Sequence, residues 1–314
     1  MNQRTVRLIV NPRSGHRPTP AQLGAAARWL TARGWRVEQR VTRGAGHARQ
    51  LAAEAAAAGC DVVLVCGGDG TINEVVNAIA GTRTALAVIP SGTVNVWARE
   101  VEIPFPTMAA VALLETGERR LVDLGRAGER YFLLLASAGT DSEAVRAVTA
   151  DRKRRWGRSI YVVEAVRDLL QHGGRLMTIE ADGERIVGRV LLAVVGNSRL
   201  YGGVFNATYH ARLDDGLLDL CIYTGSGWWE LAKHIARTIV RRHDRHKRVV
   251  YRQARRIRIH SADPIAVQAD GEHIGETSIS FDAVPNALLV VIPRGLASPL
   301  FRPLRYPYVD GGRR

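Results

Sequence analysis

The sequence has few cysteines and no long apolar run. Its 314 residues include three cysteines, Cys60, Cys66 and Cys221, whose spacing fits neither a paired disulfide framework nor a metal-binding motif. A disulfide-stabilised secreted scaffold is therefore excluded, and a reducing compartment is expected. No uncharged apolar run approaches the ~20 residues of a membrane-spanning helix, and residues 1–10 lack the pattern of a signal peptide. We expect a cytoplasmic protein that is at most peripheral at the inner face of the membrane.

Acidic residues and lysines are also scarce. The formal net charge is +14, and arginine carries almost all of the positive charge because lysine occurs only at Lys153, Lys233 and Lys247. A strongly basic protein favours anionic partners such as nucleic acids, phosphorylated substrates or anionic membranes. No recognisable nucleic-acid module accompanies the charge, so we expect no nucleic-acid partner. The chain is long enough for two domains.

The first part of the chain repeats a strand–turn–helix pattern four times. The apolar runs that predict the strands are 6–10, 35–41, 62–66 and 85–89. The polar turns that follow them are 11–15, 42–46, 67–71 and 90–95. This repeat predicts a parallel sheet with helices on both faces. Ligands bind such sheets beyond the carboxyl ends of the strands, so the four turns are expected to meet at one crevice.

After about residue 124 strands dominate. The expected strands are 131–135, 176–180, 190–195, 217–223, 257–260, 265–268 and 287–292. With helices only near 158–171 and 227–242, this pattern predicts an antiparallel β-sandwich or half-barrel. We therefore expect an α/β domain at 1–124, a β-domain at 125–296, and a basic tail at 297–314 that is disordered or packs back on the first domain.

The turn Gly67-Gly68-Asp69-Gly70-Thr71 is the clearest candidate for a binding site. It follows a buried strand and precedes apolar residues at helical spacing, an arrangement that presents backbone N–H groups to a phosphate. Asp69 is out of place if the turn only binds anions, but it is expected there if it holds a cation or accepts a proton. The alternative is an ordinary strand–helix turn with an acidic N-cap.

Six motifs occur in order along the chain. They are Asn11-Pro12-x-Ser14-Gly15, the glycine turn, Pro90-x-Gly92-Thr93-x-Asn95, Gly202-Gly203, Asp215-Gly216-Leu217-Leu218-Asp219 and Asp270-Gly271-Glu272. As a set they resemble the diacylglycerol kinase catalytic-domain family of bacterial lipid kinases, which is similar to sphingosine and ceramide kinases. The resemblance covers residues 5–295. It implies an α/β nucleotide-binding domain like those of phosphofructokinases and NAD kinases, a β-sandwich domain, and an active site between them.

The resemblance also implies an activity and its cofactors. The expected reaction transfers the γ-phosphoryl group of ATP, with Mg²⁺, to the hydroxyl of diacylglycerol or a related lipid alcohol in phospholipid biosynthesis. The expected nucleotide-binding residues are Asn11, Arg13, Ser14, Gly15, Thr42, Gly67, Gly68, Gly70, Thr71, Gly92, Thr93, Asn95 and Glu272. Asn11 and Thr42 have an alternative role in hydrogen bonds within their own turns.

The acidic residues receive separate roles from the resemblance. Asp270 is the first candidate for the general base and Asp69 is its rival, although Asp270-Gly271 alone would indicate a simple hairpin turn. Asp69 and Asp123 are the candidates for holding Mg²⁺. A structural cation is expected at Arg212, Asp215 and Leu217, where a type I turn is the alternative.

One departure from the family pattern keeps other functions open. Many members carry an aspartate after the asparagine of the third loop, whereas this chain has Val96. A non-catalytic or weakly active homologue is therefore one alternative, and NAD kinase, which shares the glycine turn, is another.

Membrane docking is expected from tryptophans beside basic residues. Trp228 and Trp229 precede a run of arginines, and a second basic cluster occupies 152–158. We expect these segments to bind an anionic membrane that contains the lipid substrate, although they are equally explained as solvated surface. The sequence leaves open whether the chain forms a homodimer.

Overall fold

A computed structural model describes most of the chain. The described ranges are 3–147, 170–203, 205–227, 248–296 and 298–302, with isolated positions at 164, 167–168, 229–230 and 233. The helices expected at 158–171 and 227–242 lie largely outside these residues, as do the basic cluster at 152–158 and the end of the tail from 303. Among the described residues, no helix has the length and apolar character needed to cross a bilayer.

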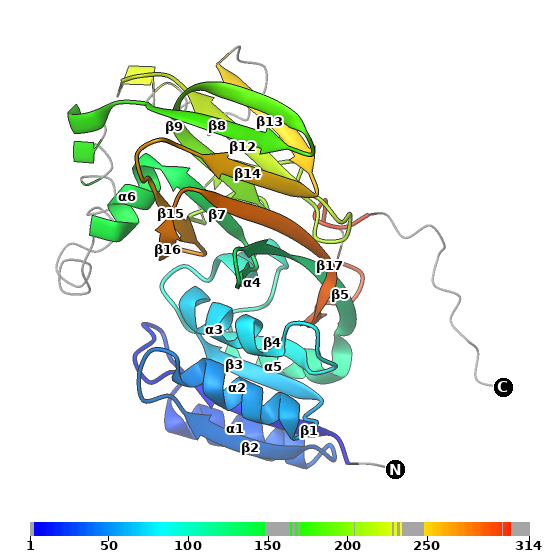
Figure 1. The fold of residues 1–314 in the computed structure, drawn as a ribbon. Helices are drawn as coiled ribbons and strands as arrows, with labels where there is room; N and C mark the ends of the chain where they lie inside the picture. The colour runs from blue at the N-terminus through cyan, green and yellow to red at the C-terminus, as the bar shows by residue number, and fades with distance from the viewer. Residues whose placement is uncertain are drawn as a thin grey trace.

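The first domain is a parallel sheet between helices. Its strands are β1 (Thr5–Val10), β2 (Arg36–Val41), β3 (Val62–Gly67) and β4 (Ala85–Pro90), and its helices are α1 (Pro20–Thr31), α2 (His47–Ala57), α3 (Asp69–Ile79), α4 (Val96–Glu100) and α5 (Thr107–Thr116). The strands pair in parallel in the order β2-β1-β3-β4. Helices α2 and α3 lie together on one face and α1 and α5 on the other (Figure 1). The predicted α/β architecture is confirmed, and coverage of both faces explains why β3 and β4 are continuous apolar runs.

The second domain is an antiparallel β-sandwich, as predicted. Its elements are β5 (Glu118–Ala127), β6 (Arg130–Phe132), β7 (Leu135–Gly139), α6 (Thr140–Ala147), β8 (Arg175–Ala181), β9 (Glu184–Gly196), β10 (Leu200–Tyr201), β11 (Phe205–Asn206), β12 (Leu218–Thr224), β13 (Val249–Ala254), β14 (Arg256–His260), β15 (Ala266–Ala269), β16 (Glu272–Glu276) and β17 (Ile279–Ile292). The inward-facing residues form a separate apolar core, in which the rings of Phe132 and Phe281 meet edge to face at 6.4 Å.

Strand β17 joins the two domains. It pairs with β14 and β5 in the second domain, and Val290 pairs in parallel with Leu86 of β4 in the first. A continuous sheet therefore passes between the domains, along the long strand that crosses the middle of Figure 1. Leu300 and Phe301, which follow β17, are buried in the core of the first domain.

One expected strand is wrong. The run at 131–135 predicted a single strand, but β6 ends at Phe132 and β7 begins at Leu135. The backbone N–H groups of Leu133, Leu134 and Leu135 instead all donate to the carboxylate of Asp270. Three successive amides can reach one carboxylate only where the strand pairing is interrupted, and an apolar run carries no signal of that interruption.

Candidate active site

Three of the four polar turns meet beyond the carboxyl ends of β1, β3 and β4. The side-chain amide of Asn11 donates to Oγ1 of Thr71 at 2.8 Å, which joins the first turn to the glycine turn. The side-chain amide of Asn95 donates to the carbonyl oxygen of Gly67 at 3.0 Å, which joins the glycine turn to the third loop. Because these strands are neighbours in the sheet, their ends bring the turns together as expected.

The first turn and the third loop also contact each other directly. The hydroxyl of Ser91 donates to the hydroxyl of Ser14 at 2.9 Å, and the backbone of His16 donates to the carbonyl of Ser91 at 2.8 Å. A Cβ built on Gly15 would lie 3.5 Å from Oγ1 of Thr93. The predicted nucleotide-binding residues of these two segments thus line one continuous rim.

The glycines of the site are required for close backbone approach. A Cβ built on Gly92 would lie 2.6 Å from the Cα of Gly68, and one built on Gly67 would lie 2.7 Å from Cβ of Thr71. None of these glycines has a positive φ. Gly68 is the N-cap of α3, and no side chain caps that helix end. The first backbone N–H groups of α3 are therefore available to an anion.

Two predicted nucleotide-binding residues lie at the margin of this arrangement. Thr42 is buried at the end of β2 and donates its N–H to the carbonyl of Val10 at 2.9 Å, whereas Arg13 is exposed. The turn after Thr42 is held to α3 because Glu74 accepts the N–H groups of Gly46 and Ala48 at 2.9 and 3.0 Å.

Asp69 lies at the first position of α3 and faces the third loop. Its Oδ1 accepts the N–H of Trp97 at 3.3 Å, at the start of α4. Burial raises the pKa of the Asp69 carboxyl, and backbone N–H groups of the third loop, including that of Val96, partly offset this effect. Val96 itself is buried and packs near the turn at Gly203, so an apolar contact occupies the position of the family acid.

Asp270 joins the second domain to α3. Its Oδ2 accepts from the side-chain amide of Asn73 at 2.7 Å. At the break between β6 and β7, the backbone N–H groups of Leu133, Leu134 and Leu135 donate to the same carboxylate at 2.8, 3.0 and 3.1 Å. Burial raises the pKa of Asp270 to about 6, and these donors act in the opposite direction. A carboxylate has about four lone-pair sites, so four donors leave no acceptor site vacant. The role of general base expected for Asp270, or for its rival Asp69, stays a prediction.

Glu272 faces the glycine turn from the second domain. A Cβ built on Gly70 would lie 3.5 Å from Oε1 of Glu272. Its other oxygen, Oε2, pairs with the guanidinium of Arg130, which also donates to the side chain of Asn73 at 3.1 Å. Asp69 and Glu272 therefore flank the N-terminus of α3 from the two domains.

Asp123 lies in a different cluster from Asp69. Its two oxygens accept the N–H groups of Gly216 at 2.6 Å and Asn286 at 2.8 Å. Nearby, Oδ1 of Asp215 accepts the N–H of Leu217 at 3.0 Å, which is a local turn contact of the kind that the sequence left as the alternative to a cation site. Burial raises the pKa of both Asp123 and Asp215. The roles expected for Asp123, Arg212, Asp215 and Leu217 stay predictions.

Two residues of the site were not expected from the sequence. Asn73 donates to Asp270, and Arg130 pairs with Glu272 and donates to Asn73, yet neither Asn73 nor Arg130 belongs to a recognised motif. Asn73 did carry a signal, because it lies at helical spacing among the apolar residues of α3 and is 1% exposed. A polar side chain on the buried face of a helix requires a partner. Arg130 carried no comparable signal.

The comparisons with known proteins cover both domains. A family model described as "Diacylglycerol kinase catalytic domain" matches residues 5–127. A second, described as "YegS C-terminal NAD kinase beta sandwich-like domain", matches residues 135–292. A curated diacylglycerol kinase from Staphylococcus aureus (strain bovine RF122 / ET3-1) is 31% identical over 298 residues, which are 94% of this chain and 95% of that relative. The crystal structure of a diacylglycerol kinase from Bacillus anthracis str. Sterne superposes with a TM-score of 0.77 at 24% identity, over 93% of this chain and 98% of that one.

Proposed function

The chain belongs to the diacylglycerol kinase family of lipid kinases, and on this premise we propose that it transfers the γ-phosphoryl group of ATP to the hydroxyl of diacylglycerol or a related lipid alcohol. The observation that carries the proposal is the uncapped N-terminus of α3, which lies where three strand-end turns meet and between two carboxylates, Asp69 and Glu272. Such a helix end binds phosphate groups, and the carboxylates supply the remaining chemistry.

In this proposal the first domain binds the nucleotide. The phosphates lie against the N–H groups of Gly68, Gly70 and Thr71, and the rim formed by Asn11 and Thr93 orients them. Because phosphoryl transfer has a loose transition state, catalysis depends mostly on positioning and on neutralising charge. The acceptor hydroxyl approaches from the second domain, where the turn at 270–272 faces the helix end.

Asp69 is the residue that fits a magnesium ion. Among the described residues, no group of three or more His, Cys, Asp or Glu side chains could hold a metal. Mg²⁺ commonly takes only one or two carboxylates and completes its coordination with water and phosphate oxygens, so the single carboxylate of Asp69 beside the phosphate-binding turn is sufficient. A bound Mg²⁺ would neutralise negative charge on the phosphates. Holding Mg²⁺ in this way requires neither Asp123 nor an acidic residue at position 96.

We assign proton acceptance to Glu272 and positioning to Asp270. Glu272 directs Oε1 toward the glycine turn, while all four acceptor sites of Asp270 are engaged by Asn73 and three backbone amides. A general base must reach the proton that it removes, and geometry is the first criterion. Asp270 fixes the position of the turn that carries Glu272.

The first experiment tests the reaction itself. The protein is incubated with labelled ATP, Mg²⁺ and a panel of lipid alcohols, with NAD as a competing acceptor and Asp69→Ala as the site variant. We expect label on diacylglycerol or a related lipid, no label on NAD, and at least a hundredfold loss of rate in the variant. Labelled NAD would favour the NAD kinase alternative, and a protein that binds ATP but labels no lipid would favour a non-catalytic homologue.

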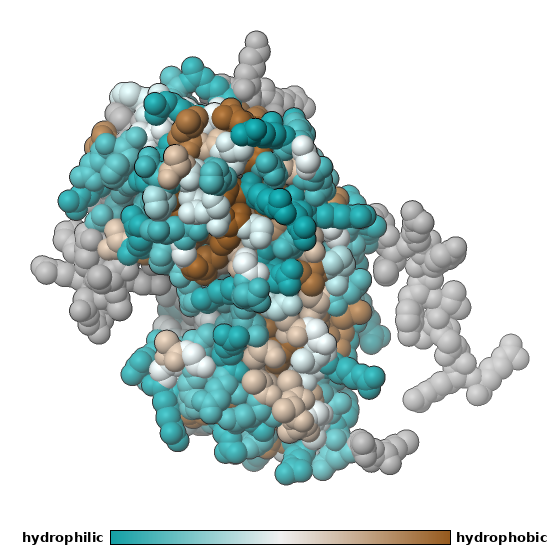
Figure 2. Space-filling model, viewed as in Figure 1, coloured by the Kyte–Doolittle hydropathy of each residue, from teal (hydrophilic) through white to brown (hydrophobic). Residues whose placement is uncertain are grey.

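We further propose that the outer face of the second domain docks on an anionic membrane. Arg256 and Arg258 of β14 are exposed on this face, and Leu176 of β8 and Val187 of β9 are 63% and 58% exposed. Figure 2 shows apolar residues surrounded by hydrophilic ones over this domain. Basic residues around exposed apolar side chains suit the interface of an anionic bilayer.

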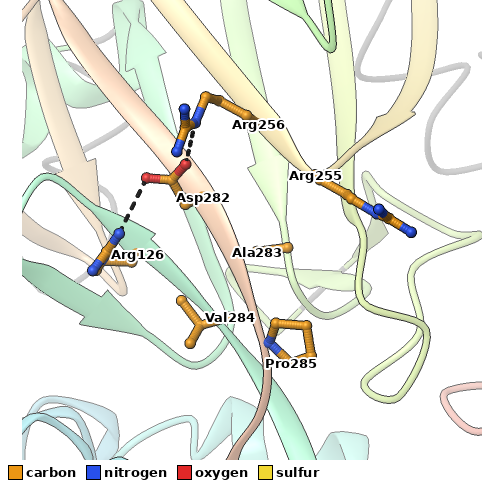
Figure 3. Close-up of a pocket in the computed structure, with 7 residues that line it drawn as sticks. All are labelled: Arg126, Arg255, Arg256, Asp282, Ala283, Val284 and Pro285. Carbon is orange, nitrogen blue, oxygen red and sulfur yellow. Dashed lines mark hydrogen bonds and ion pairs between the residues drawn. The ribbon is translucent and has the colours of Figure 1, made fainter.

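A shallow pocket at one end of this face shows how its charges are arranged. Arg126 and Arg256 approach Asp282 from two sides, at 3.5 and 2.6 Å, whereas Arg255 points away from it (Figure 3). One acid between two arginines leaves an excess of positive charge. Ala283 of β17 lies between these groups.

Vesicle binding tests this docking face. Each basic residue near an anionic surface contributes about 1 kcal/mol, so the double variant Arg256→Ala/Arg258→Ala should bind vesicles that contain anionic lipid about 10- to 30-fold more weakly. The matched control is Arg36→Ala/Arg83→Ala, which removes two exposed arginines from the first domain. Cosedimentation at two salt concentrations measures the effect. An equal loss of vesicle affinity in both double variants, or an affinity that does not depend on the charge of the lipid, would contradict the choice of this face.

A further inference from the structure

A polar cluster in the second domain lies outside the proposed chemistry. Asp141, in the first turn of α6, accepts the hydroxyl of Ser137 at 2.6 Å and that of Ser142 at 3.1 Å. The phenol of Tyr201 also donates to Asp141. Ser137 and Ser142 are fully buried, so the carboxylate gathers three hydroxyl groups inside the domain. A network of this kind is costly unless each member is satisfied, and when satisfied it fixes the local geometry.

One end of this cluster holds the turn at 270–272. The side-chain amide of Gln268 donates to the hydroxyl of Ser137 at 2.6 Å, and its oxygen accepts the N–H of Gly271 at 2.8 Å. Asp270 and Gly271 both have positive φ angles, of 49° and 83°. Because aspartate rarely adopts that conformation, the turn depends on its hydrogen bonds to keep its shape.

The other end of the cluster reaches the third nucleotide loop. Tyr201 precedes Gly202 and Gly203, and a Cβ built on Gly203 would lie 2.4 Å from a methyl carbon of Val94 and 3.4 Å from one of Val96. The turn formed by Gly202 and Gly203 therefore packs directly against the third loop, which we propose binds the nucleotide. Glu100, at the end of α4, strengthens this contact by accepting the N–H of Arg199 at 2.8 Å.

We propose that Tyr201, Asp141, Ser137 and Gln268 form a positioning relay between the third nucleotide loop and the turn that carries Glu272. The relay rests on the proposed function, since it couples the two walls of that site. When the nucleotide orders the third loop, the turn after Tyr201 is held in place, and the hydrogen-bonded chain holds Gly271 and hence Glu272 against the acceptor. The apolar contact of Val96 with the Gly203 turn is part of this connection. Nucleotide binding and acceptor alignment are thereby linked.

The chain offers a matched control for the first link. Tyr251 donates to the carboxylate of Asp219 at 2.6 Å, so it makes the same kind of partly buried tyrosine–aspartate hydrogen bond as Tyr201, but outside the relay. Tyr201→Phe and Tyr251→Phe therefore remove equivalent bonds from the same domain. We expect Tyr201→Phe to lower kcat five- to twentyfold, and Tyr251→Phe to leave kcat within twofold of wild type at a comparable loss of Tm.

A double-mutant cycle tests whether the members act as one unit. Ser137→Ala should lower kcat by about as much as Tyr201→Phe, and the double variant should lose no more than either single variant, because a chain that is already broken cannot be broken again. Equal kcat in Tyr201→Phe and Tyr251→Phe, or additive losses in the cycle, would overturn the relay.

A binding readout separates failure of the relay from failure of the proposed function. Amide hydrogen exchange of residues 269–272 is measured with and without ATP and Mg²⁺. Wild type and Tyr251→Phe should gain protection in this turn when the nucleotide binds, and Tyr201→Phe should gain none. If the protein phosphorylates no lipid yet shows this pattern, the proposed reaction is wrong and the relay stands. If nucleotide binding protects the turn equally in all three proteins, the relay is wrong.

Discussion

Replacing Glu272 by glutamine is expected to lower kcat for lipid phosphorylation by about 10²- to 10⁴-fold, the usual contribution of a positioned general base. The substitution keeps the size of the side chain and removes its ability to accept a proton. Glu272 is partly exposed and pairs with Arg130, so the neutral variant should fold normally. Affinity for ATP should change little, because the amides at the start of α3 remain. Steady-state kinetics with a lipid acceptor and a nucleotide-binding titration measure the two quantities.

Two further variants identify which carboxylate accepts the proton. Glu276→Gln neutralises an acid at the other end of β16 that pairs with Arg146, and it should leave kcat unchanged. Asp270→Asn should lower both kcat and Tm, because it disturbs the four donors that converge on this side chain. A large loss of kcat in Asp270→Asn at wild-type Tm, with little loss in Glu272→Gln, would return the role of base to Asp270.

Replacing Gly92 by alanine is expected to weaken nucleotide binding at least tenfold and to lower Tm. The new Cβ would lie 2.6 Å from the Cα of Gly68, and backbone on both sides leaves no flexible group that can move away. The third loop and the glycine turn must separate, which costs about 1–3 kcal/mol in a well-packed site. Separation also displaces the N-cap of α3, where we place the phosphates.

The control for this prediction is Gly188→Ala in β9. No heavy atom beyond its chain neighbours lies within 4 Å of a Cβ built there, and its φ is not in the left-handed region. We expect wild-type nucleotide affinity and a Tm equal to or slightly above that of wild type, since alanine is the more favourable residue inside a strand. If calorimetry gave Gly92→Ala the same nucleotide affinity as Gly188→Ala, the phosphates would have to bind elsewhere.

The fold was accessible to sequence reasoning because its signals are local. The apolar run before Gly67, the turn after it and the helical spacing from Ile72 each lie within a few residues, and a repeat of such units has few possible topologies. The same locality explains the error at 131–135. Leucines predict a strand there whether or not a distant carboxylate attracts their amides, and Asp270 lies 135 residues away from the nearest of them.

The sequence by itself determined that a glycine turn with an acid at its centre follows a buried strand, and that this turn lies at the same edge of a parallel sheet as the turns at 11–15, 42–46 and 90–95. Parallel strands of one sheet end at the same edge, so the repeat was enough to place the turns there, whereas the pairing of β1 with β3 that makes the turns at 11–15 and 67–71 neighbours came from the tertiary structure. Only the tertiary structure decided which hydrogen-bond donors surround each carboxylate. Hydrogen bonds to Asp123 and Asp270 come from segments far apart in sequence. The number of donors around each carboxylate, which sets its capacity to accept a proton or hold a cation, is therefore a property of packing.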